Sequence, residues 1–549
     1  MIKKENQDLS KEKLLAEIER LKRELKKRKK YGLVWEEKLE EVVETCKEKL
    51  PVLKEVKNKE IITDKDKPLN LLIEGDNYHA LSVLNYTHAK KIDVIYIDPP
   101  YNTGNKDFIF NDHYVDKEDS YRHSKWLSFM EKRLKLARNL LKDNGVIFIS
   151  IDDNEMAQVK LLCNEIFGEQ NFVANYIWES RSGKGATAKH VVNQHEYVLC
   201  FARDIQKIEL KQDIREAMGG NFEDENGRYR REQLRQWGQG DKREDRPTMY
   251  YPINGPNGSI IYPVKEDGAE GRWRVSKKTM EKLISSGDVD FVFDGKRYQV
   301  YRKIREGRIT KTATGTLLLG VGTASTGTLE LKQLFKDKVF DTTKPMGLIK
   351  YLIDLIAHRE ITVLDFMAGS GTTGHVVLEM NKEDSGNRKF ILCTNNENSI
   401  ATDICYPRIK IVMEGYKSLK GEKVEGLGGN LKYFKTDFVD AEPTDKNKIK
   451  LTEQATEMLC VKEGTFEMVL DQKNFKIFKN FNHYTGIIFD QITIPAFKKA
   501  IKAIKGKFSV YVFSLGDETF DDEFKDIKQK VQLSPIPEAI LRVYRRIFK

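Results

Sequence analysis

The sequence predicts an α/β fold built on a mostly parallel sheet with helices on both faces. Short apolar runs rich in β-branched residues alternate with helical stretches such as 124–141, and each run ends in turn or polar residues. Buried strands that alternate with helices are typical of parallel sheets covered on both sides. The predicted strands lie at 70–75, 92–101, 145–152, 361–366 and 389–394.

This alternation is interrupted once, and the interruption divides the 549 residues into five expected parts. An irregular stretch rich in Gly, Pro, Arg and aromatic residues separates the third predicted strand from the fourth, and we interpret it as an inserted domain. A small α/β unit with a helix at 494–504 is expected after the last strand. The expected parts are a helical segment at 1–60, the first part of the sheet domain at 61–180, the inserted domain at 181–335, the second part of the sheet domain at 336–430 and a C-terminal α/β domain at 431–549.

The N-terminal segment is almost entirely charged apart from one apolar seam, formed by Leu14, Ile18, Leu21 and Leu25. That spacing follows a heptad. The segment is therefore expected to be either an amphipathic helix that packs on its own chain or a coiled coil that joins two copies. A second helix is expected from Trp35 to about Lys49, ending before Pro51.

Composition excludes several protein classes. The net charge of +10 and the pI of about 8.9 are compatible with a polyanionic partner but do not require one. The six cysteines include no CxxC pair and no cluster at zinc spacing, so we expect reduced thiols and no metal site. Neither an N-terminal apolar signal region nor an apolar window long enough for a membrane span is present. We therefore expect a cytoplasmic protein outside the membrane.

The first motif with chemical content is the tetrapeptide Asp98, Pro99, Pro100 and Tyr101, directly after the strand DVIYI. Ligands of open α/β sheets bind at such carboxyl ends. Consecutive prolines stiffen the turn and donate no hydrogen bond, so their carbonyls remain available as acceptors. An exocyclic amine of a base has two N–H groups and needs two acceptors, which the Asp98 carboxylate and the Pro99 carbonyl can supply. Tyr101 offers an aromatic face for a base turned out of the duplex.

The second motif runs from Asp365 through Phe366, Gly369, Gly371 and Thr372 to Gly374, between the strand ITVLD and a helix. Small residues at a helix N-terminus let a ligand approach free backbone N–H groups. Read alone, the glycine spacing with Glu397 downstream also matches a dinucleotide fingerprint, which leaves nicotinamide binding open. In combination with the first motif, which has no role in hydride transfer, the loop favours S-adenosylmethionine.

The order of these motifs resembles the β-class of amino-methyltransferases, whose Rossmann-like domain has DPPY first, a target-recognition region next and the cofactor motif last. Most of residues 31–549 also resembles the modification (Mod) subunit of type III restriction–modification systems. The aspartate at the first motif position resembles the branch that methylates N6 of adenine more than the N4-cytosine branch. The stretches that carry this resemblance are LLIEGDNYHAL (71–81), DPPYNTG (98–104), RPTMYYPI (246–253), GRWRV (271–275), DTTKPMGLIKYLI (341–353) and PIPEAILRVYRRI (535–547).

The resemblance implies further cofactor contacts. Lys344 and Pro345 match the segment whose helix closes over the methionine moiety, and Asp76 matches a polar residue near the cofactor adenine, although a helix N-cap is its alternative role. Glu397 matches the acceptor of the ribose hydroxyls, and the adjacent Asn395 and Asn396 compete for that role.

Arg and Lys with interleaved aromatic residues in the irregular region predict contacts to DNA phosphates and bases. Because base readout depends on groove geometry, no target sequence follows from them. The candidates are Arg181 and Lys184 in the basic stretch 180–190, and Arg230, Arg231, Arg246, Arg272 and Arg274.

Three functions follow as hypotheses. The first is a methyltransferase that modifies N6 of adenine in duplex DNA, with N4 of cytosine as the variant. The second is a non-catalytic DNA-recognition subunit of a nuclease complex, and the third a methyltransferase for RNA or protein. The resemblance implies three partners: double-stranded DNA, a second copy of the chain and a separate ATP-dependent restriction subunit. The sequence has no GxxxxGK[ST] motif, so DNA cleavage would require such a subunit.

Overall fold

The computed structural model describes residues 33–64, 66–183, 190–481 and 483–548. The heptad seam at Leu14 to Leu25 and the candidate Lys184 lie outside these residues. The chain divides into two compact units, which we call the main unit (1–210 with 316–549) and the inserted unit (211–315).

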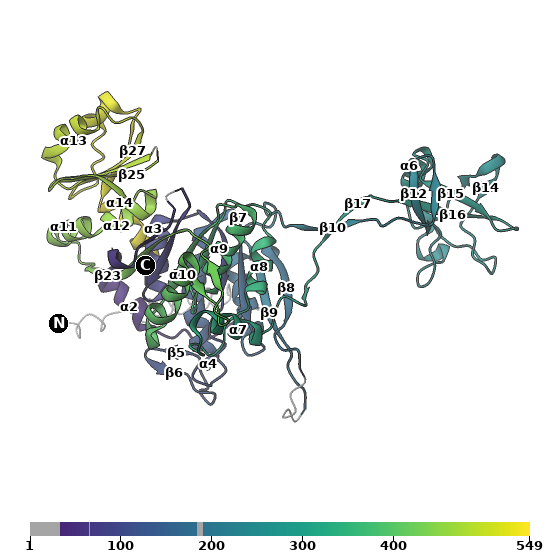
Figure 1. Cartoon of the computed structure of the whole chain (residues 1–549), viewed down its shortest axis with the longest axis horizontal. Helices are drawn as coiled ribbons and strands as arrows, with labels where there is room; N and C mark the ends of the chain where they lie inside the picture. The colour runs from purple at the N-terminus through teal and green to yellow at the C-terminus, as the bar shows by residue number, and fades with distance from the viewer. Residues whose placement is uncertain (1–32, 65, 184–189, 482, 549) are drawn as a thin grey trace, which may run out of the picture. The chain divides into compact units, whose positions relative to one another are not determined.

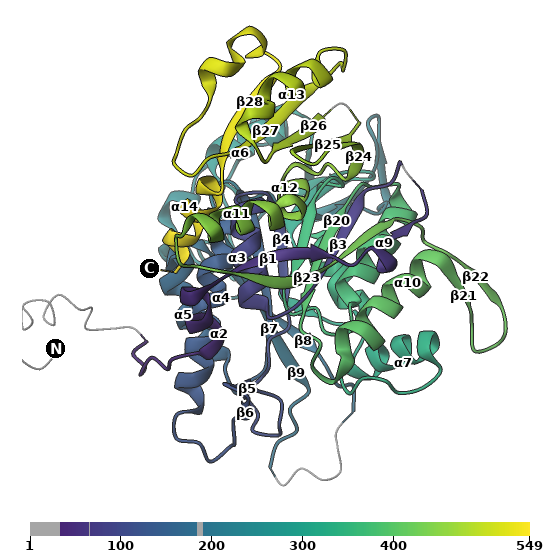
Figure 2. The ribbon, with the colours of Figure 1, turned by 90° about the vertical axis from the view of Figure 1, so that its left-hand side faces the viewer.

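The main unit is built on one mixed sheet whose central strands are parallel, as the sequence predicts (Figures 1 and 2). The six strands from β23 to β7 run parallel, and antiparallel strands flank them at both ends. In spatial order the strands are β1 (Lys49–Glu55), β23 (Asn430–Asp440), β3 (Leu69–Glu74), β20 (Lys389–Thr394), β19 (Thr362–Asp365), β4 (Ile92–Ile97), β7 (Leu141–Ile151), β9 (His195–Ala202), β8 (Phe172–Glu179) and β18 (Leu317–Leu318), with β2 (Ile61–Ile62) paired to β23.

Helices cover both faces of this sheet because alternate residues of its strands point to opposite sides. On β4, Ile95 and Ile97 belong to one core, whereas Val94 and Tyr96 belong to the other. Figure 2 shows the two helical layers on either side of the strands. The first layer comprises α2 (Glu41–Glu48), α3 (Asn77–Thr87), α4 (Arg122–Leu140) and α5 (Met156–Phe167), and the second comprises α7 (Ala324–Phe335), α8 (Met346–Asp354), α9 (Thr372–Asp384) and α10 (Tyr406–Glu414).

The C-terminal part of the main unit carries a second sheet, in which two antiparallel pairings are followed by two parallel ones. The Tyr544 hydroxyl donates to the Pro51 carbonyl, which ties the last helix to the central sheet. The elements are α11 (Asp445–Gln454), α12 (Thr456–Glu463), β24 (Glu467–Asp471), β25 (Phe475–Asn480), β26 (His483–Ile488), α13 (Ile494–Ile501), β27 (Lys507–Phe513), β28 (Val531–Ile536) and α14 (Glu538–Ile547).

The inserted unit is an antiparallel β structure with one helix on a small apolar core (Figure 1). Two strands, β10 (Gln212–Glu216) and β17 (Ile309–Ala313), form its stem, where the chain enters and leaves. Its four-stranded sheet has the order β11 (Phe222–Asp224), β12 (Gly227–Gln233), β16 (Tyr298–Arg305) and β15 (Val289–Phe293), and the remaining elements are β13 (Ile253–Asn254), β14 (Ile260–Ile261) and α6 (Lys277–Ser285).

Short elements complete the chain. They are β5 (Ile109–Phe110), β6 (His113–Tyr114), β21 (Gly415–Lys417), β22 (Lys423–Glu425), the 3-10 turns η1 (Lys57–Lys59), η2 (Glu169–Asn171), η3 (Arg243–Asp245), η4 (Pro247–Met249), η5 (Pro256–Gly258), η6 (Glu397–Ser399), η8 (Gln491–Thr493) and η9 (Asp521–Ile527), and the π-helix η7 (Ile400–Cys405). No helix in the described part of the chain combines the length and apolar composition of a membrane span.

Several expected boundaries differ from the structure. The compact inserted unit covers 211–315 rather than 181–335, because β9, β18 and α7 belong to the main unit. The helix expected from Trp35 to about Lys49 is shorter, since the chain becomes strand β1 at Lys49 and pairs with β23. Pro51 is tolerated there because β1 is an edge strand. The last expected helix ends at Ile501, not at 504.

Candidate active site

The two chemical motifs lie at the same edge of the central sheet. Strand β4 ends at Ile97, directly before Asp98, and β19 ends at Asp365. These strands are parallel neighbours, with Leu364 aligned to Ile95. Since the carboxyl ends of parallel strands meet at one edge, the DPPY turn and the glycine loop are brought together although they lie far apart in the sequence.

The DPPY turn is fixed from behind by buried side chains. The Trp126 indole donates to the Pro100 carbonyl at 2.7 Å, so this carbonyl is occupied. Asn102, the residue directly after the DPPY turn, is fully buried with a φ of 58°. Its side-chain amide donates to Glu155 Oε1 at 2.6 Å and to the Arg122 carbonyl at 3.2 Å. Asparagine tolerates this left-handed conformation better than most residues. The turn is therefore held rigidly at the candidate catalytic residues.

Asp98 is part of a cluster in which two carboxylates share one ammonium group. Lys344 Nζ lies 2.9 Å from Asp98 Oδ1 and 3.4 Å from Glu196 Oε2. The Tyr101 hydroxyl donates to the same Glu196 Oε2 at 2.8 Å. When both carboxylates are ionised, the cluster carries one net negative charge.

Burial and the lysine act on Asp98 in opposite directions. Desolvation raises the pKa of the Asp98 carboxyl and Glu196 adds to that rise, whereas the adjacent Lys344 ammonium opposes it. Desolvation lowers the pKa of Lys344, but the two carboxylates outweigh it, so its pKa lies above the usual value. The Asp98 side chain remains 30% exposed while its Oδ1 is buried, so the exposed part of the carboxylate lies away from the lysine.

Two aromatic rings line the cluster. Lys344 Nζ lies 4.8 Å from the centroid of the Tyr101 ring and 5.7 Å from that of Trp178. The Trp178 indole donates to the Gly322 carbonyl at 2.7 Å, which fixes the orientation of this buried ring. The site thus combines charged acceptors with flat apolar surfaces, as a pocket for a heterocyclic amine requires.

The glycine loop is shaped by the carboxylate of Asp365. This carboxylate accepts hydrogen bonds from the Met367 backbone N–H at 3.0 Å and from the Thr373 hydroxyl at 2.6 Å. Burial raises its pKa to about 7. Gly369 and Gly371 have φ values of 50° and 80°, in the left-handed region that favours glycine. A Cβ at Gly369 would make only ordinary contacts, the nearest at 3.7 Å from Phe340 Cζ, so the left-handed φ rather than crowding accounts for glycine at this position.

Most side chains of the loop point into the protein. The Thr372 hydroxyl accepts from Arg408 at 2.8 Å, and the Ser370 hydroxyl accepts from the same guanidinium at 3.2 Å. Arg408 and Phe366 are both fully buried. Any ligand contacts of Phe366 and Thr372 would therefore involve the backbone.

The third glycine of the fingerprint has a packing role. A Cβ at Gly374 would lie 2.8 Å from Ile409 Cδ1 and 2.9 Å from Leu392 Cδ1. Glycine is thus required for α9 to approach β20 and α10. This requirement is independent of the ligand, so the glycine spacing does not by itself discriminate between a nicotinamide dinucleotide and S-adenosylmethionine.

Asp76 has the N-cap role that the sequence analysis held as an alternative. Its Oδ1 accepts from the Tyr78 backbone N–H at 2.7 Å at the start of α3. Its Oδ2 lies 3.5 Å from the buried guanidinium of Arg133. The side chain is still 29% exposed at the carboxyl end of β3, so a ligand contact remains compatible with the cap.

The three candidates for the ribose contact differ in availability. The Asn396 side-chain oxygen accepts from the Ala401 and Thr402 backbone N–H groups, both at 3.1 Å, and so caps the following turn. Asn395 and Glu397 are exposed, and the Asn395 amide donates to Glu397 Oε2 at 3.4 Å. This leaves Glu397 and Asn395 as the stronger candidates.

Lys344 and Pro345 lie at the entrance to α8. Pro345 is the residue that precedes the helix, and a Cβ on Gly327 of α7 would lie 2.1 Å from the Thr343 carbonyl. Close packing of α7 against this segment therefore positions Lys344. The family resemblance implied that Lys344 lies near the methionine part of the cofactor. In the structure its partners are the carboxylates of Asp98 and Glu196.

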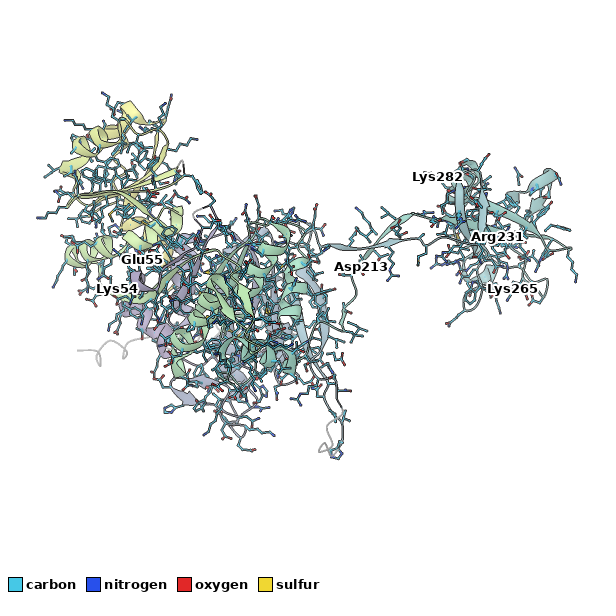
Figure 3. The ribbon with its side chains drawn as sticks, viewed as in Figure 1. Lys54, Glu55, Asp213, Arg231, Lys265 and Lys282 are labelled. Carbon is cyan, nitrogen blue, oxygen red and sulfur yellow. The ribbon has the colours of Figure 1, made fainter. Side chains whose placement is uncertain are left out.

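The candidate DNA-binding residues fall into two groups. Two are engaged within the inserted unit: Arg231 forms an ion pair with Asp290 at 2.6 Å, and Arg272 donates to the Gly240 carbonyl. Arg274 is exposed but contacts Glu232 at 3.2 Å. Figure 3 labels Arg231 within this unit.

The other group is free to contact a partner. Arg230 and Arg246 in the inserted unit and Arg181 in the main unit are exposed. Within the described chain, their guanidinium groups have no ion-pair or hydrogen-bond partner. Residues 211–315 carry 22 Lys and Arg against 17 Asp and Glu, so this fifth of the chain supplies half of its net charge of +10.

Four residues of the site were not predicted from the sequence: Glu196, Trp178, Asn102 and Glu155. Glu196 and Trp178 are aligned on the antiparallel strands β9 and β8, which lay near or inside the region interpreted as irregular. The apolar run YVLCFA directly after Glu196 was an available signal for a buried strand with a charged residue at its start.

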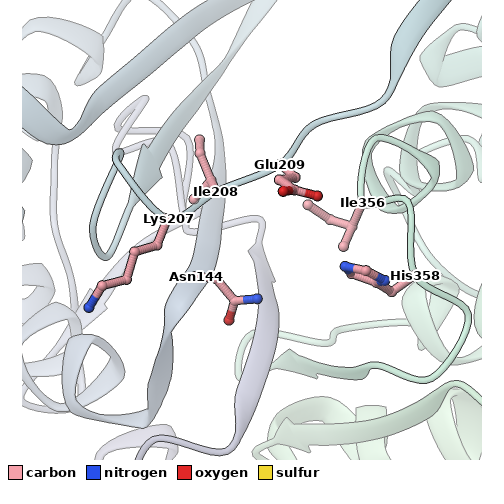
Figure 4. A pocket seen from close by; sticks show the side chains of 6 residues that line it. All are labelled: Asn144, Lys207, Ile208, Glu209, Ile356 and His358. Atoms are coloured by element: carbon pink, nitrogen blue, oxygen red, sulfur yellow. The ribbon is translucent and has the colours of Figure 1, made fainter.

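One cavity of the main unit lies at the opposite edge of the sheet. It has a volume of about 220 Å³ and lies beside the start of β7 and the residues before β19 (Figure 4). It is lined by Asn144, Lys207, Ile208, Glu209, Ile356 and His358. Within the described residues, no group of three or more His, Cys, Asp or Glu side chains is arranged to hold a metal ion.

Comparison with known proteins identifies the family. Residues 92–405, more than half of the chain, match the family described as DNA methylase. This match spans both motifs and the region between them. The chain therefore belongs to the DNA methylase family, and the α/β fold and family predicted from the sequence are confirmed.

Particular relatives are of two kinds. The chain is 36% identical to the type III restriction-modification enzyme StyLTI Mod subunit of Salmonella typhimurium, over 62% of this chain and 55% of that protein. It is 35% identical to the EcoPI Mod subunit of Escherichia phage P1, over 60% of this chain and 58% of that protein. It is 34% identical to the type II methyltransferase M.KpnI of Klebsiella pneumoniae, over 64% of this chain and 89% of that protein. The aligned region thus spans little more than half the length of the two Mod subunits.

Proposed function

We propose that this chain is a site-specific DNA methyltransferase that transfers a methyl group from S-adenosylmethionine to N6 of adenine in duplex DNA. The observation that carries the proposal is the meeting of the DPPY turn and the glycine loop at the ends of adjacent parallel strands. Membership of the DNA methylase family and 34–36% identity to M.KpnI and the StyLTI Mod subunit support it.

The residues present are compatible with the cofactor. No atom crowds the backbone at Gly369, and the N-terminus of α9 offers backbone donors. The exposed Glu397 and Asn395 offer acceptors for a nucleoside with a charged amino-acid tail. When bound, the cofactor supplies a methyl group on a positively charged sulfur. Gly369, Gly371 and Asp365 would shape its site, with Asp76 near the adenine.

The chain's own residues would activate the target amine. Asp98 and the Pro99 carbonyl accept its two N–H groups, which directs the nitrogen lone pair toward the methyl group, and Tyr101 stacks on the flipped base. The nitrogen forms the new N–C bond while the C–S bond breaks and its electron pair stays on sulfur. The nitrogen then gives up one proton to the Asp98 carboxylate, from which it passes to solvent.

The inserted unit is proposed to recognise the DNA target. Its excess of positive charge and the unpaired Arg230 and Arg246 support phosphate contacts. By analogy with the Mod subunits, we further propose a modification role in the cytoplasm, with a second copy of the chain and a separate ATP-dependent restriction subunit as partners.

Modification-sensitive sequencing of DNA from cells that express only this chain tests the proposal. We expect N6-methyladenine at one short sequence motif in cells with the wild-type chain. The Asp98→Ala variant should leave that motif unmodified, while the control Glu179→Gln, on strand β8, should modify it fully. Unmodified DNA with the wild-type chain, or full modification with Asp98→Ala, would refute the proposal.

A further inference from the structure

We propose that Glu196 is a positioning residue for methyl transfer, which shares Lys344 with Asp98 and leaves the cluster with one net negative charge. This inference deepens the proposed function and rests on it. Glu196 belongs to neither of the motifs that identify the family. It comes from β9, an antiparallel strand beyond the parallel part of the sheet.

The geometry shows that Glu196 acts on both catalytic neighbours of the target base. Its Oε2 accepts the Tyr101 hydroxyl at 2.8 Å and lies 3.4 Å from Lys344 Nζ. Lys344 in turn contacts the buried Oδ1 of Asp98 at 2.9 Å. Because Lys344 is only 12% exposed, water screens these contacts little, and each partner strongly affects the other.

Without Glu196, Lys344 would have Asp98 as its one carboxylate partner in the cluster. A complete ion pair would weaken Asp98 as an acceptor for the target amine and would bring the net charge of the cluster to zero. With Glu196 the single ammonium is divided between two carboxylates. The exposed side of Asp98 then remains available as an acceptor for the N–H of the base.

The residual charge matters because positive charge moves during the reaction. It starts on the sulfur of the methyl donor and develops on the amine nitrogen as the N–C bond forms. A fixed negative charge beside that nitrogen stabilises the transition state more than the uncharged amine that precedes it. Glu196 therefore contributes to turnover, whereas a residue that only packs would contribute to stability.

Glu196→Gln separates these two roles, since glutamine keeps the size and an oxygen acceptor for Tyr101 but loses the charge. We expect turnover at saturating DNA and cofactor to fall about tenfold or more, with the KM for DNA changed less than about threefold. The matched control is Glu179→Gln. Glu179 lies on the adjacent strand β8 beside His195, has no ion pair to Lys344, and its loss should leave both constants unchanged.

A second measurement does not depend on activity. The pH dependence of Lys344 acetylation, followed by mass spectrometry of its peptide in the full chain, reports the ionisation of this lysine. Because Glu196 helps to raise the pKa of Lys344, Glu196→Gln should shift the acetylation profile to lower pH. The same substitution should move the acid limb of the pH profile of turnover to lower pH, since Glu196 also raises the pKa of Asp98.

The titratable groups that face Asp98 are Lys344, Glu196, Tyr101, Tyr96 and Asp365.

The outcomes discriminate between failure of this inference and failure of the proposed function. If Asp98→Ala abolishes transfer but Glu196→Gln matches Glu179→Gln in turnover and in Lys344 acetylation, the role of Glu196 is wrong and the proposed function stands. If the wild-type chain transfers no methyl group, the proposed function itself fails. A profile shift of Lys344 together with unchanged turnover would also overturn the inference, because the charge would then be present without a catalytic effect.

Discussion

The cluster of Asp98, Glu196 and Lys344 and the sheet of the inserted unit balance their charges differently. At the corner, Asp98 and Glu196 share the one ammonium of Lys344. On one face of the inserted sheet, three carboxylates face three basic side chains, so the charges balance although Arg305 contacts two of the carboxylates. Asp224 pairs with Lys303 at 2.6 Å and Arg305 at 2.7 Å, Asp288 with Arg305 at 2.9 Å, and Asp290 with Arg231 at 2.6 Å.

The consequences for pKa are also opposite. Hydrogen bonds from Gln299 and from backbone N–H groups lower the pKa of Asp294 in the inserted unit to about 2. Behind the DPPY turn, burial raises the pKa of Glu155 to about 8. Hydrogen bonds thus favour the ionised form of Asp294, whereas burial favours the protonated form of Glu155.

The largest effect is expected from removal of the shared ammonium group. Lys344→Met leaves Asp98 and Glu196 facing each other without a cation, which raises the pKa of Asp98 further. At neutral pH we expect methyl transfer to fall by about 100-fold or more, because an uncompensated buried carboxylate takes up a proton and no longer accepts the amine. Initial rates of labelled methyl transfer over a range of pH provide the measurement.

The sign of the pH dependence is the critical observation for this variant. Activity should recover in part as pH rises, since the raised pKa of Asp98 is then passed. Lys350→Met, which removes a surface lysine paired with Glu383, is the matched control and should resemble the wild type. A Lys344→Met profile parallel to that of the wild type would show that the lysine does not set the charge of Asp98.

A smaller effect is expected from an unpaired arginine of the inserted unit. Arg230 is exposed on β12 without a partner in the described chain, directly beside the paired Arg231. Arg230→Gln should weaken DNA binding severalfold and reduce the slope of log affinity against log salt by about one, with stability unchanged. Fluorescence anisotropy with duplex DNA at several salt concentrations measures both. An unchanged salt slope would remove Arg230 from the DNA interface.

Much of the fold could be predicted from the sequence because local patterns specify it. The alternation of apolar strands with helices predicted the parallel sheet, and the motif order predicted which strand ends meet. What it missed depends on distant pairing. Strand β1 forms only because β23 returns beside it, and β9 joins the sheet by antiparallel pairing with β7. Neither partner is visible in the local sequence.

The same limit applies to the candidate site. The glycines and Asp98 were recognisable because backbone conformation and strand ends dictate them. The inward orientation of Thr372 depends on Arg408, which lies 36 residues further along the chain. The contact of Lys344 with Asp98 depends on packing of α7 against the residues that precede α8. Such contacts follow from tertiary structure rather than from residue type.

Next in size is the loss of a paired arginine, the neighbour of Arg230. Arg231 combines its ion pair to Asp290 with stacking at 3.8 Å from the Phe222 ring centroid. Arg231→Gln should lower the stability of the inserted unit by about 1 kcal/mol and leave the salt slope of DNA binding unchanged. Hydrogen exchange of the amides in 211–315 measures this, because melting of the whole chain mixes two units. A changed salt slope with intact protection would assign Arg231 to the DNA instead.

The smallest effect is the pH dependence of local stability, which should have opposite signs around the DPPY turn and in the inserted unit. The pKa of Glu155 rises from 4.5 to about 8 on folding, so its contribution is most favourable below 4.5 and is lost as pH rises through about 8. The pKa of Asp294 falls from 3.8 to about 2, so its contribution is present above 3.8 and is lost as pH falls toward 2. Amide hydrogen exchange, corrected for intrinsic rates, should show less protection around the DPPY turn as pH rises through about 8. Protection of the inserted sheet should not change in that pH range. Glu155→Gln should remove the pH dependence around the DPPY turn and leave that of the inserted sheet unchanged. A wild-type profile in that variant would mean that Glu155 is ionised in the folded chain, with His123 Nδ1 at 2.6 Å as its partner.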